Sequence, residues 1–223
     1  MKAVCLISGG IDSAVTAAIA KSRGFAVHAL TFDYGQRHKK EIECAKSIAK
    51  WLGANHKIIR IDLAQLGGSA LTSDIEIETG KTPDEIKSSP IPATYVPARN
   101  TIFLSFALAY AETIGADVVF IGANAVDYSG YPDCRPEYIE AFQRMADLAT
   151  KRAVEGAPIK IEAPILNLDK AQIIKKGKEM GVPFEKTWSC YKGGKKACGV
   201  CASCVLRLDG FKRAGVGDGV EYE

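Results

Sequence analysis

Four cysteines near the end of the chain have the clearest chemical meaning; they are Cys190, Cys198, Cys201 and Cys204. Their spacing is C-x7-C-x2-C-x2-C, and gaps of two residues allow adjacent thiolates to converge on one tetrahedral zinc ion. Glycines between them supply turns. An iron–sulfur cluster or a redox C-x-x-C pair would also use cysteines, although neither needs this glycine-rich spacing. The pattern therefore favours a structural zinc site, which can order a tail too small to have its own core.

A second group of residues, 8–13 with the sequence SGGIDS, is suited to bind phosphate. Glycines let a backbone approach an anion closely, and the N–H groups and dipole of a following helix attract it. The serines add hydroxyl donors, whereas a carboxylate beside phosphates requires a cation, for which Mg²⁺ is the usual choice. The alternative is an Asp-capped helix after a Gly-Gly turn. The residues expected to contact the phosphates are Ser8, Gly9, Gly10, Ile11, Asp12 and Ser13.

The elements that must position this loop alternate between short apolar runs and helical periodicity. We expect strands at 4–7, 26–32 and 57–63, and helices at 13–23 and 39–52. Strand and helix alternate with connections of a few residues, which is typical of parallel strands joined by right-handed crossovers. The sequence therefore predicts an α/β fold with a parallel, doubly wound sheet.

The periodicity stops between residues 65 and 97, where glycines and prolines punctuate a long polar segment. Loops of this length inside a domain are uncommon and usually functional, so we expect a lid or a partner-facing loop. Further helices are predicted at 100–114, 137–152 and 169–180, the last capped by Asp169, with strands at 118–121 and 159–162. The chain should then divide into a phosphate-binding α/β domain, 1–185, and a small zinc-binding segment, 186–223.

The composition is that of a soluble globular protein, with 47% hydrophobic and 25% charged residues. Lys and Arg number 29 against 26 Asp and Glu, and a net charge of +3 is too small to hold a long polyanion by charge alone. Direct contact with nucleic acid is therefore not expected. No stretch reaches the roughly 18 apolar residues that span a bilayer, and the N-terminal residues do not resemble a signal peptide. We predict a cytoplasmic protein without membrane contact, whose cysteines are reduced.

Three cysteines lie outside the C-terminal group. Cys5, in a predicted strand, and Cys44, in a predicted helix, are interpreted as small buried hydrophobes. Cys134 lies in the rigid segment 131–136 after the fourth predicted strand, where ligand sites of α/β proteins are found, although it too can be a packing residue.

Residues 8–13 resemble the pyrophosphate-binding loop of the ATP-pyrophosphatase (PP-loop) superfamily, which includes GMP, NAD and asparagine synthetases and tRNA thiolation enzymes. The resemblance implies an adenine nucleotide alpha-hydrolase-like fold, cleavage of ATP between its α and β phosphates, and transfer of adenylate to a carbonyl or carboxylate oxygen. It also implies that the backbone near Thr31 and Phe32 reads adenine and that Lys170 contacts phosphate. An exposed first-turn lysine is the alternative for Lys170.

Four further features resemble the 7-cyano-7-deazaguanine (preQ0) synthase family of the queuosine pathway: residues 32–38 (FDYGQRH), 95–100 (YVPARN), 130–135 (GYPDCR) and the cysteine spacing. The match covers nearly the whole chain; Ile11 and Ala14 stand where many members have Leu and Thr. It implies conversion of 7-carboxy-7-deazaguanine to its nitrile with ammonia and ATP. No residues remain for a glutamine-hydrolysing domain, so ammonia must come from solution or a partner. Related enzymes and the segment 65–97 suggest a homodimer.

Within that resemblance, Asp133 is expected to accept hydrogen bonds from the guanine-like N–H edge, since a carboxylate fits that donor edge. Arg99 or Arg135 would hold the substrate carboxylate or a phosphate, and Tyr95 or Tyr131 would stack on the ring. Structural roles are the alternatives: a turn cap for Asp133, an ion pair for Arg99 and core packing for the tyrosines. The residues expected to carry catalysis are Asp12, Ser13, Asp133 and Lys170.

Two other functions stay open from the sequence. One is a different PP-loop amidotransferase or NAD-synthetase-like ligase. The other is a zinc-stabilised nucleotide- or RNA-binding module without turnover, supported by a basic group around the cysteines that is more often a solvated face. That group consists of Lys192, Lys195, Lys196, Arg207, Lys212 and Arg213.

Overall fold

The fold is built on a five-stranded sheet with the order β3-β2-β1-β4-β5, in which every neighbouring pair is parallel. A computed structural model describes residues 1–126 and 131–223. The strands are β1 (Lys2–Leu6), β2 (Ala26–Asp33), β3 (Asn55–Arg60), β4 (Val118–Phe120) and β5 (Lys160–Glu162). From β1 the chain adds β2 and β3 on one side of the sheet and then β4 and β5 on the other, so the topological switch point lies between β1 and β4. This order confirms the predicted doubly wound α/β fold.

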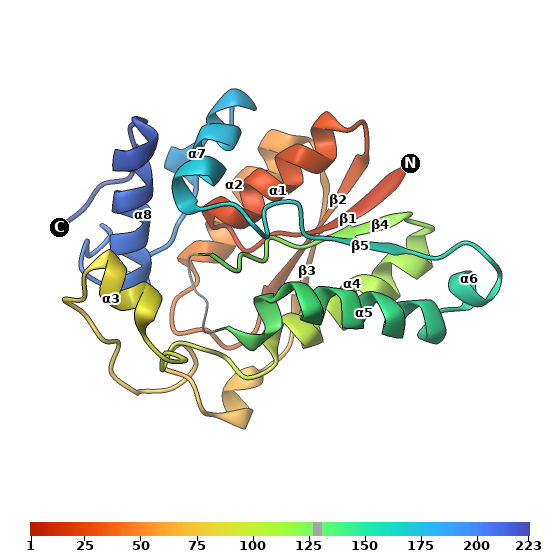
Figure 1. Ribbon diagram of the computed structural model, residues 1–223, viewed down its shortest axis with the longest axis horizontal. Coiled ribbons are helices and arrows are strands. Elements are labelled where there is room, and N and C mark those ends of the chain that lie inside the picture. Colours follow the sequence, from red (N-terminus) through yellow and green to blue (C-terminus); the bar gives the residue numbers. More distant parts are fainter. Residues whose placement is uncertain (127–130) are drawn as a thin grey trace.

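Helices cover both faces of the sheet (Figure 1). Successive side chains of a strand point to opposite faces, so Ala3 and Cys5 pack on one side and Val4 and Leu6 on the other. The first side carries α1 (Ile11–Ser22), α2 (Lys40–Leu52) and α7 (Lys170–Glu179), with α8 (Ala202–Ala214) packed against α7. The second side carries α4 (Arg99–Ile114) and α5 (Pro136–Ala149). The shorter helices are α3 (Pro83–Ser88), α6 (Lys151–Val154), and the 3₁₀ turns η1 (Leu63–Leu66), η2 (Pro132–Cys134) and η3 (Phe184–Lys186).

Several predicted boundaries are wrong by a few residues for identifiable reasons. β3 covers residues 55–60 because its ladder with β2 runs from the pair His28 and Asn55 to the pair Asp33 and Arg60. The helix expected at 137–152 is two helices, because Thr150 takes an extended backbone and begins α6. Its hydroxyl donates to the Ala146 carbonyl at 3.0 Å and accepts from the Ala153 N–H at 3.3 Å.

The segment between residues 65 and 97 packs against the C-terminal cysteines. Ala70 and Ile77 share a buried cluster with all four of those cysteines, and Thr79 forms an isolated antiparallel bridge with Cys201. The helix α3 within it begins at a capping box formed by Thr82 and Glu85. The segment is therefore partly ordered by the cysteine-containing tail; its role as a lid or a dimer contact stays a prediction.

Among the described residues, no helix combines the length and the apolar character needed to cross a membrane.

Candidate functional site

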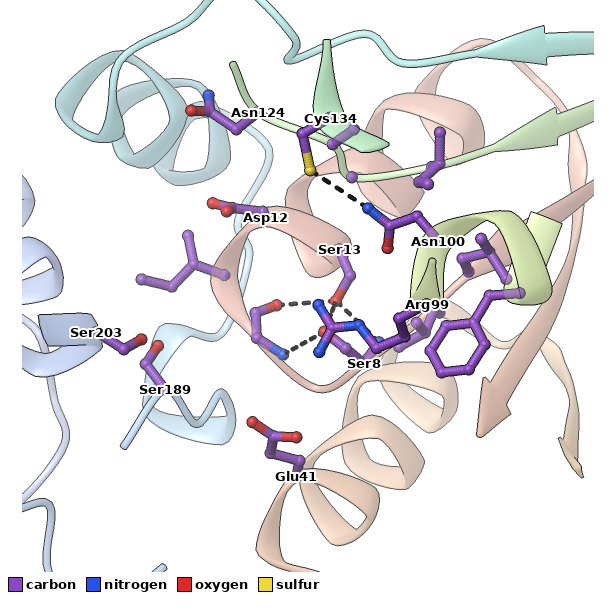
Figure 2. A pocket seen from close by; sticks show the side chains of 18 of the residues that line it. Ser8, Asp12, Ser13, Glu41, Arg99, Asn100, Asn124, Cys134, Ser189 and Ser203 are labelled. Atoms are coloured by element: carbon purple, nitrogen blue, oxygen red, sulfur yellow. Dashed lines mark hydrogen bonds between the residues drawn. The ribbon is translucent and has the colours of Figure 1, made fainter. Parts of the chain in front are cut away.

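A cavity of about 280 Å³ opens at the carboxyl ends of β1, β2 and β4, at the point where the strand order reverses. A second described cavity, beside α3, holds only about 30 Å³, so the first is the one with room for a substrate. Figure 2 shows polar side chains from several elements surrounding the cavity. Ligands of doubly wound folds bind at such a switch point, because loops from both halves of the sheet diverge there.

The phosphate loop forms one wall of the cavity and is held closed by its two serines. Ser13 Oγ donates to the Gly10 carbonyl at 3.0 Å and accepts from the Ser8 N–H at 3.2 Å, while the two hydroxyl oxygens lie 3.1 Å apart. The first bond of α1 runs from the Ala14 N–H to the Gly10 carbonyl, and residues 11–13 line the cavity ahead of it. The loop thus presents the start of a helix and two hydroxyls to an anion.

Gly9, by contrast, does not line the cavity but packs the loop against α2. Its φ is +90°, and a Cβ there would lie 2.1 Å from the Glu41 carbonyl oxygen. Its own carbonyl accepts the Trp188 N–H at 2.9 Å. Only glycine permits this close approach, which fixes α2 and the tail against the loop.

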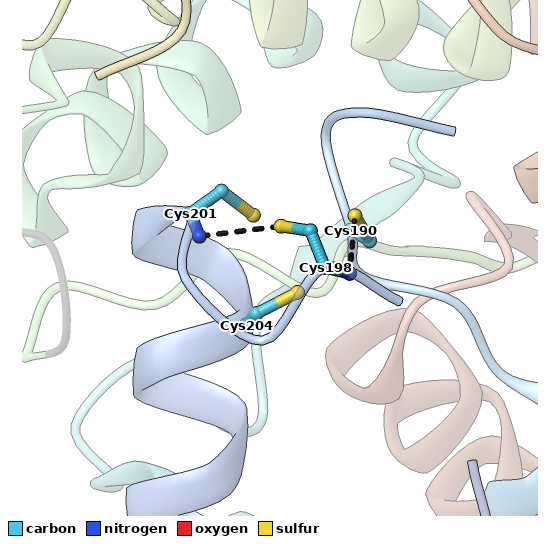
Figure 3. A group of neighbouring side chains, drawn as sticks. All are labelled: Cys190, Cys198, Cys201 and Cys204. Atoms are coloured by element: carbon cyan, nitrogen blue, oxygen red, sulfur yellow. Dashed lines mark hydrogen bonds between the residues drawn. The ribbon is translucent and has the colours of Figure 1, made fainter. Parts of the chain in front are cut away.

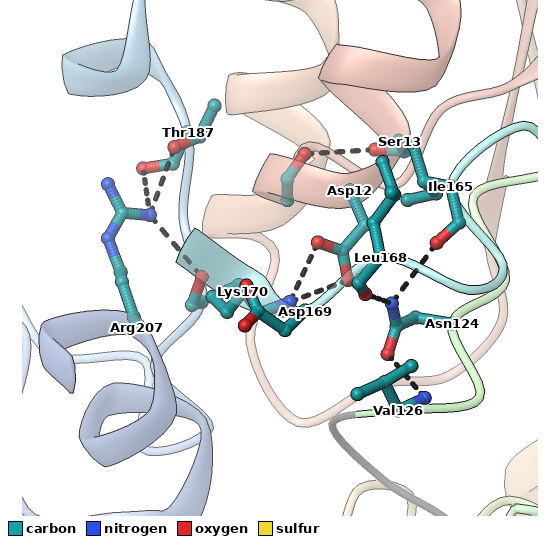
Figure 4. Close-up of polar contacts among 12 residues, drawn as sticks. Asp12, Ser13, Asn124, Val126, Ile165, Leu168, Asp169, Lys170, Thr187 and Arg207 are labelled. Atoms are coloured by element: carbon teal, nitrogen blue, oxygen red, sulfur yellow. Dashed lines mark hydrogen bonds and ion pairs between the residues drawn. The ribbon is translucent and has the colours of Figure 1, made fainter. Parts of the chain in front are cut away.

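Lys170 reaches the loop from α7 (Figure 4), while its contact with phosphate stays a prediction. Its Nζ lies 2.7 and 2.9 Å from the two carboxylate oxygens of Asp12. Asp169 caps α7 with a capping box to Gln172, as predicted. Asn124, which the sequence analysis missed, fixes the turn before α7 by donating to the Ile165 carbonyl at 3.2 Å and to the Leu168 carbonyl. A cation and a carboxylate are therefore paired at residues 8–13, where the sequence predicts a phosphate site.

The opposite wall combines charged and aromatic groups from α2, α4 and the end of β2. Arg99 lines the cavity and donates from Nη1 to the Tyr34 hydroxyl at 3.4 Å. Glu41 also lines it, and burial raises the pKa of this carboxyl to about 7 despite the opposing effect of Arg99. Phe32 and Tyr131, two predicted residues, are part of the lining.

Asp133 lies outside the cavity lining and has a structural partner. It is buried, and its Oδ2 accepts the Asn100 backbone N–H at 3.0 Å in the first turn of α4. Its backbone carbonyl accepts from the Asn100 side chain at 3.1 Å. Burial raises the pKa of its carboxyl, which these contacts oppose. The arrangement is that of a capping residue supplied from another segment.

Three other predicted residues also lie outside the lining. The Tyr95 hydroxyl accepts the N–H of Ala98, whose φ of 53° marks a tight turn. Thr31 Oγ1 donates to the Ile7 carbonyl at 2.7 Å. Arg135 is exposed at the start of α5. Gly130 of the segment 130–135 lies outside the described residues.

The four C-terminal cysteines come together as predicted (Figure 3). All four are buried, and their sulfur atoms lie within 4.8 Å of one another. The Cys198 N–H donates to Cys190 Sγ, and the Cys201 N–H donates to Cys198 Sγ, each over an N-to-S distance of 3.4 Å. Ser189, Tyr191 and Ser203 each adjoin a cysteine of the cluster in sequence and line the cavity, so the cluster supports one wall of the site.

Arg207 is buried, although the sequence favours a solvent-exposed position for the basic group around the cysteines. It is only 2% exposed and lines the cavity, and its Nε donates to both carboxylate oxygens of Asp218 at 2.9 Å. Its Nη1 donates to Thr187 Oγ1 at 2.9 Å and to Ser189 Oγ at 3.3 Å. The interpretation of Arg207 as a surface residue is therefore wrong, because a buried ion pair neutralises it. Nothing in the local spacing distinguished it from its exposed neighbours.

The sheet, its switch-point cavity and the helix-initiating loop together define a doubly wound α/β protein whose loop is suited to bind an anion. The chain belongs to the family described as queuosine biosynthesis protein QueC, which matches residues 2–215. This confirms the family expected from residues 32–38, 95–100 and 130–135 and from the cysteine spacing.

Relatives at high identity carry one name. The 7-cyano-7-deazaguanine synthase of Desulfatibacillum aliphaticivorans is 57% identical over 225 residues, covering 99% of this chain and 96% of the relative. That of Thermoplasma acidophilum is 54% identical over 224 residues, covering 100% of this chain and 92% of the relative. Among solved structures, NMN synthetase from Francisella tularensis matches with a TM-score of 0.48 and 21% identity, over 88% of this chain and 66% of that chain.

Proposed function

We propose that this chain is a 7-cyano-7-deazaguanine synthase, which uses ATP and ammonia to convert 7-carboxy-7-deazaguanine to the nitrile preQ0. The observation that carries the proposal is the phosphate loop paired with Lys170 at the switch-point cavity, in a chain that belongs to the QueC family. Relatives that are more than half identical over at least 92% of their length bear this name.

ATP is required because a carboxylate is a poor electrophile. Attack of the substrate carboxylate on the α phosphorus releases pyrophosphate and gives an acyl adenylate, and ammonia then replaces AMP to form the amide with loss of a proton. Adenylation of the amide oxygen by a second ATP allows AMP and a proton to leave as the C≡N bond forms. Both activations place adenylate on an oxygen of the same carbon, so one cavity can serve both.

The chain's own residues act by position and charge. The amides of residues 11–13 and the hydroxyls of Ser8 and Ser13 would hold the pyrophosphate as it leaves. Lys170 would neutralise it, exchanging Asp12 for phosphate. Phe32, at the end of β2, lines the cavity where adenine is expected, and the backbone of Thr31 precedes it.

Asp12 fits a magnesium ion, because its carboxylate is a hard oxygen donor that lines the cavity at the phosphate loop. When bound, Mg²⁺ would neutralise the phosphates and polarise the α phosphoryl group. The ion pair with Lys170 holds the Asp12 side chain at that position.

The cysteine cluster fits zinc, since four buried sulfurs already lie within 4.8 Å of one another. Four bonds of about 2.3 Å in a tetrahedron separate the sulfurs by roughly 3.8 Å, so small adjustments suffice. We propose that residues 186–223 bind zinc as a structural segment on the ATP-binding part, 1–185. A cytoplasmic homodimer that takes ammonia from solution or a partner stays our prediction.

The direct test is incubation of the protein with 7-carboxy-7-deazaguanine, ammonium and MgATP, with products identified by mass. Formation of the nitrile is expected. ATP binding without a product would favour a binding module instead, and formation of a different amide from nicotinic acid adenine dinucleotide would favour an NAD-synthetase-like ligase.

A further inference from the structure

We infer that Glu41 recognises the guanine-like edge of the substrate by accepting hydrogen bonds from its ring N–H and its exocyclic amino group. The inference rests on the proposed function and names the residue that selects the ring. The two N–H groups of that edge lie side by side, and the two oxygens of a carboxylate match them. Hydrogen bonds to a charged acceptor are among the strong ones.

Few carboxylates are available for this role. Among the described residues that line the cavity, only Asp12 and Glu41 carry one. Asp12 lies in the phosphate loop and is occupied by Lys170 at 2.7 and 2.9 Å. Asp133, the residue expected from the sequence, lies outside the lining and already accepts the Asn100 N–H. Glu41 is therefore the carboxylate in the lining that is available to accept hydrogen bonds from the N–H edge of the ring.

Glu41 is held in place by its backbone while its side chain stays available. The Glu41 carbonyl is packed against Gly9, and the preceding Lys40 lies over the Trp188 ring, with Nζ 3.6 Å from the ring centroid. Among the described residues, none donates a hydrogen bond to the Glu41 carboxylate. Figure 2 shows that carboxylate directed into the cavity. A half-buried acceptor without a donor is costly, and a ligand with two N–H groups would satisfy it.

The surroundings suit a flat ring. Aromatic side chains from four parts of the chain line the same cavity; they are Phe32, Tyr34, Phe103, Tyr131, Trp188 and Tyr191. Arg99 from α4 lines it as well and provides a donor for the ring carbonyl or the substrate carboxylate. Flat apolar walls with few polar groups at fixed positions are the usual construction of a site that reads a heterocycle.

The test compares 7-carboxy-7-deazaguanine with its analogue lacking the 2-amino group. We expect the native enzyme to prefer the amino compound by about 10- to 100-fold in kcat/KM, the value of one charge-assisted hydrogen bond. In Glu41→Gln, which can accept only one bond and presents an amide donor, the KM for the natural substrate should rise at least about 10-fold. In this variant the values of kcat/KM for the two compounds should differ by no more than about 3-fold. The KM values for ATP and ammonium should be unchanged.

Glu43→Gln is the matched control, because Glu43 lies on the same helix, exposed and ion-paired with Lys46. It should behave as the native enzyme. An unchanged preference for the amino compound in Glu41→Gln would overturn the inference. A rise in the KM for ammonium without a rise in the KM for 7-carboxy-7-deazaguanine would also overturn it.

Calorimetric binding of the two compounds separates this inference from the proposed function. If the native protein binds both compounds but forms no nitrile, the proposed function fails. The binding comparison between the native protein and Glu41→Gln then still tests whether Glu41 recognises the 2-amino group. If the nitrile forms and Glu41→Gln binds both compounds as the native protein does, only the inference fails.

Discussion

Asp12 and Lys170 show how single residues prepare this cavity for an anion. They come from α1 and α7, 158 positions apart in sequence, yet the ammonium contacts both carboxylate oxygens. The pair lines the cavity beside the phosphate loop, so neither charge is buried alone. Binding of a triphosphate would redirect Lys170 to phosphate and leave Asp12 to a cation, which makes the loop responsive to the metal–nucleotide complex.

Replacing Ser13 with Ala should reduce turnover about 10- to 100-fold, because one hydroxyl donor to a charged phosphate is lost. In the structure this hydroxyl gives its single proton to the Gly10 carbonyl and closes the turn, so it must rotate to donate to phosphate. Its removal should also loosen the loop and raise the KM for ATP. Ser22→Ala, at the far end of α1, is the control and should be neutral. Substrate-dependent exchange of labelled pyrophosphate into ATP is the readout; equal exchange rates in the two variants would contradict the role given to the loop.

Glu41 should make stability depend on pH. Its folded pKa, about 7, lies above the ordinary value of 4.5, so between these pH values the folded protein holds a proton that the unfolded chain has lost. The stabilisation of the folded state by protonated Glu41 is complete below pH 4.5 and is lost as the pH rises through 7. The charged groups acting on it are Arg99 and Cys190.

Relative to Glu41→Gln, the native protein should therefore lose about 1–3 kcal/mol of unfolding free energy between pH 5 and 8. Urea unfolding at a series of pH values measures the difference. Parallel curves for the two proteins would show that the carboxyl titrates normally.

The phosphate loop and the cysteines could be predicted because their chemistry depends on neighbours a few positions away. Asp133 and Glu41 could not be told apart in this way. Both are carboxylates in polar segments, and only the packing of η2 against α4 shows that Asp133 caps a helix. The position of Glu41 depends on the contact of α2 with Gly9, a relation that no local pattern contains.

At the scale of elements, close packing of α7 and α8 holds Lys170 in place. A Cβ at Gly210 of α8 would lie 2.3 Å from Lys170 Cγ and 2.9 Å from its Cβ. Gly210→Ala should therefore displace the lysine stem, lowering the unfolding free energy by about 1–3 kcal/mol and weakening ATP binding. Gly217→Ala, which meets nothing within 4 Å, is the control. Denaturant unfolding and nucleotide titration would reveal the effect; a Gly210 variant as stable and as tight-binding as the control would show that the contact is dispensable.

The same packing explains why α8 was missed in the sequence while the strands were found. The sheet strands are short apolar runs and most face helices on both sides, which gives a strong signal. α8 has Gly210 in its interior and Cys204 and Arg207 among its buried residues, so it lacks a clear apolar stripe. Glycine normally weakens a helix, and here it is required by the neighbour rather than by the helix itself.

The whole molecule closes its cavity with both ends of the chain. Ser8 and Asp12 come from the N-terminal loop, whereas Trp188, Ser189 and Ser203 come from the segment around the cysteines. Gly9 accepts a hydrogen bond from the Trp188 N–H, which joins the two ends directly. Residues 186–223, which we propose bind zinc, are thus expected to complete the active site.

Metal removal should accordingly abolish ATP binding before the sheet unfolds. A strong chelator, or Cys201→Ser, should release residues 186–223 and change the fluorescence of Trp188 while far-UV circular dichroism of the sheet is largely kept. Cys44→Ser removes a cysteine outside the cluster and should leave zinc content and ATP binding unchanged. Metal analysis showing no zinc in the native protein would remove the basis of this expectation.

The most direct measurement follows oxygen from substrate to nucleotide. With 7-carboxy-7-deazaguanine labelled by ¹⁸O in both carboxylate oxygens, adenylation of each oxygen in turn predicts two AMP molecules per nitrile, each carrying one ¹⁸O atom. Unlabelled AMP, or label recovered in inorganic phosphate together with ADP, would contradict activation by adenylate transfer at the phosphate loop.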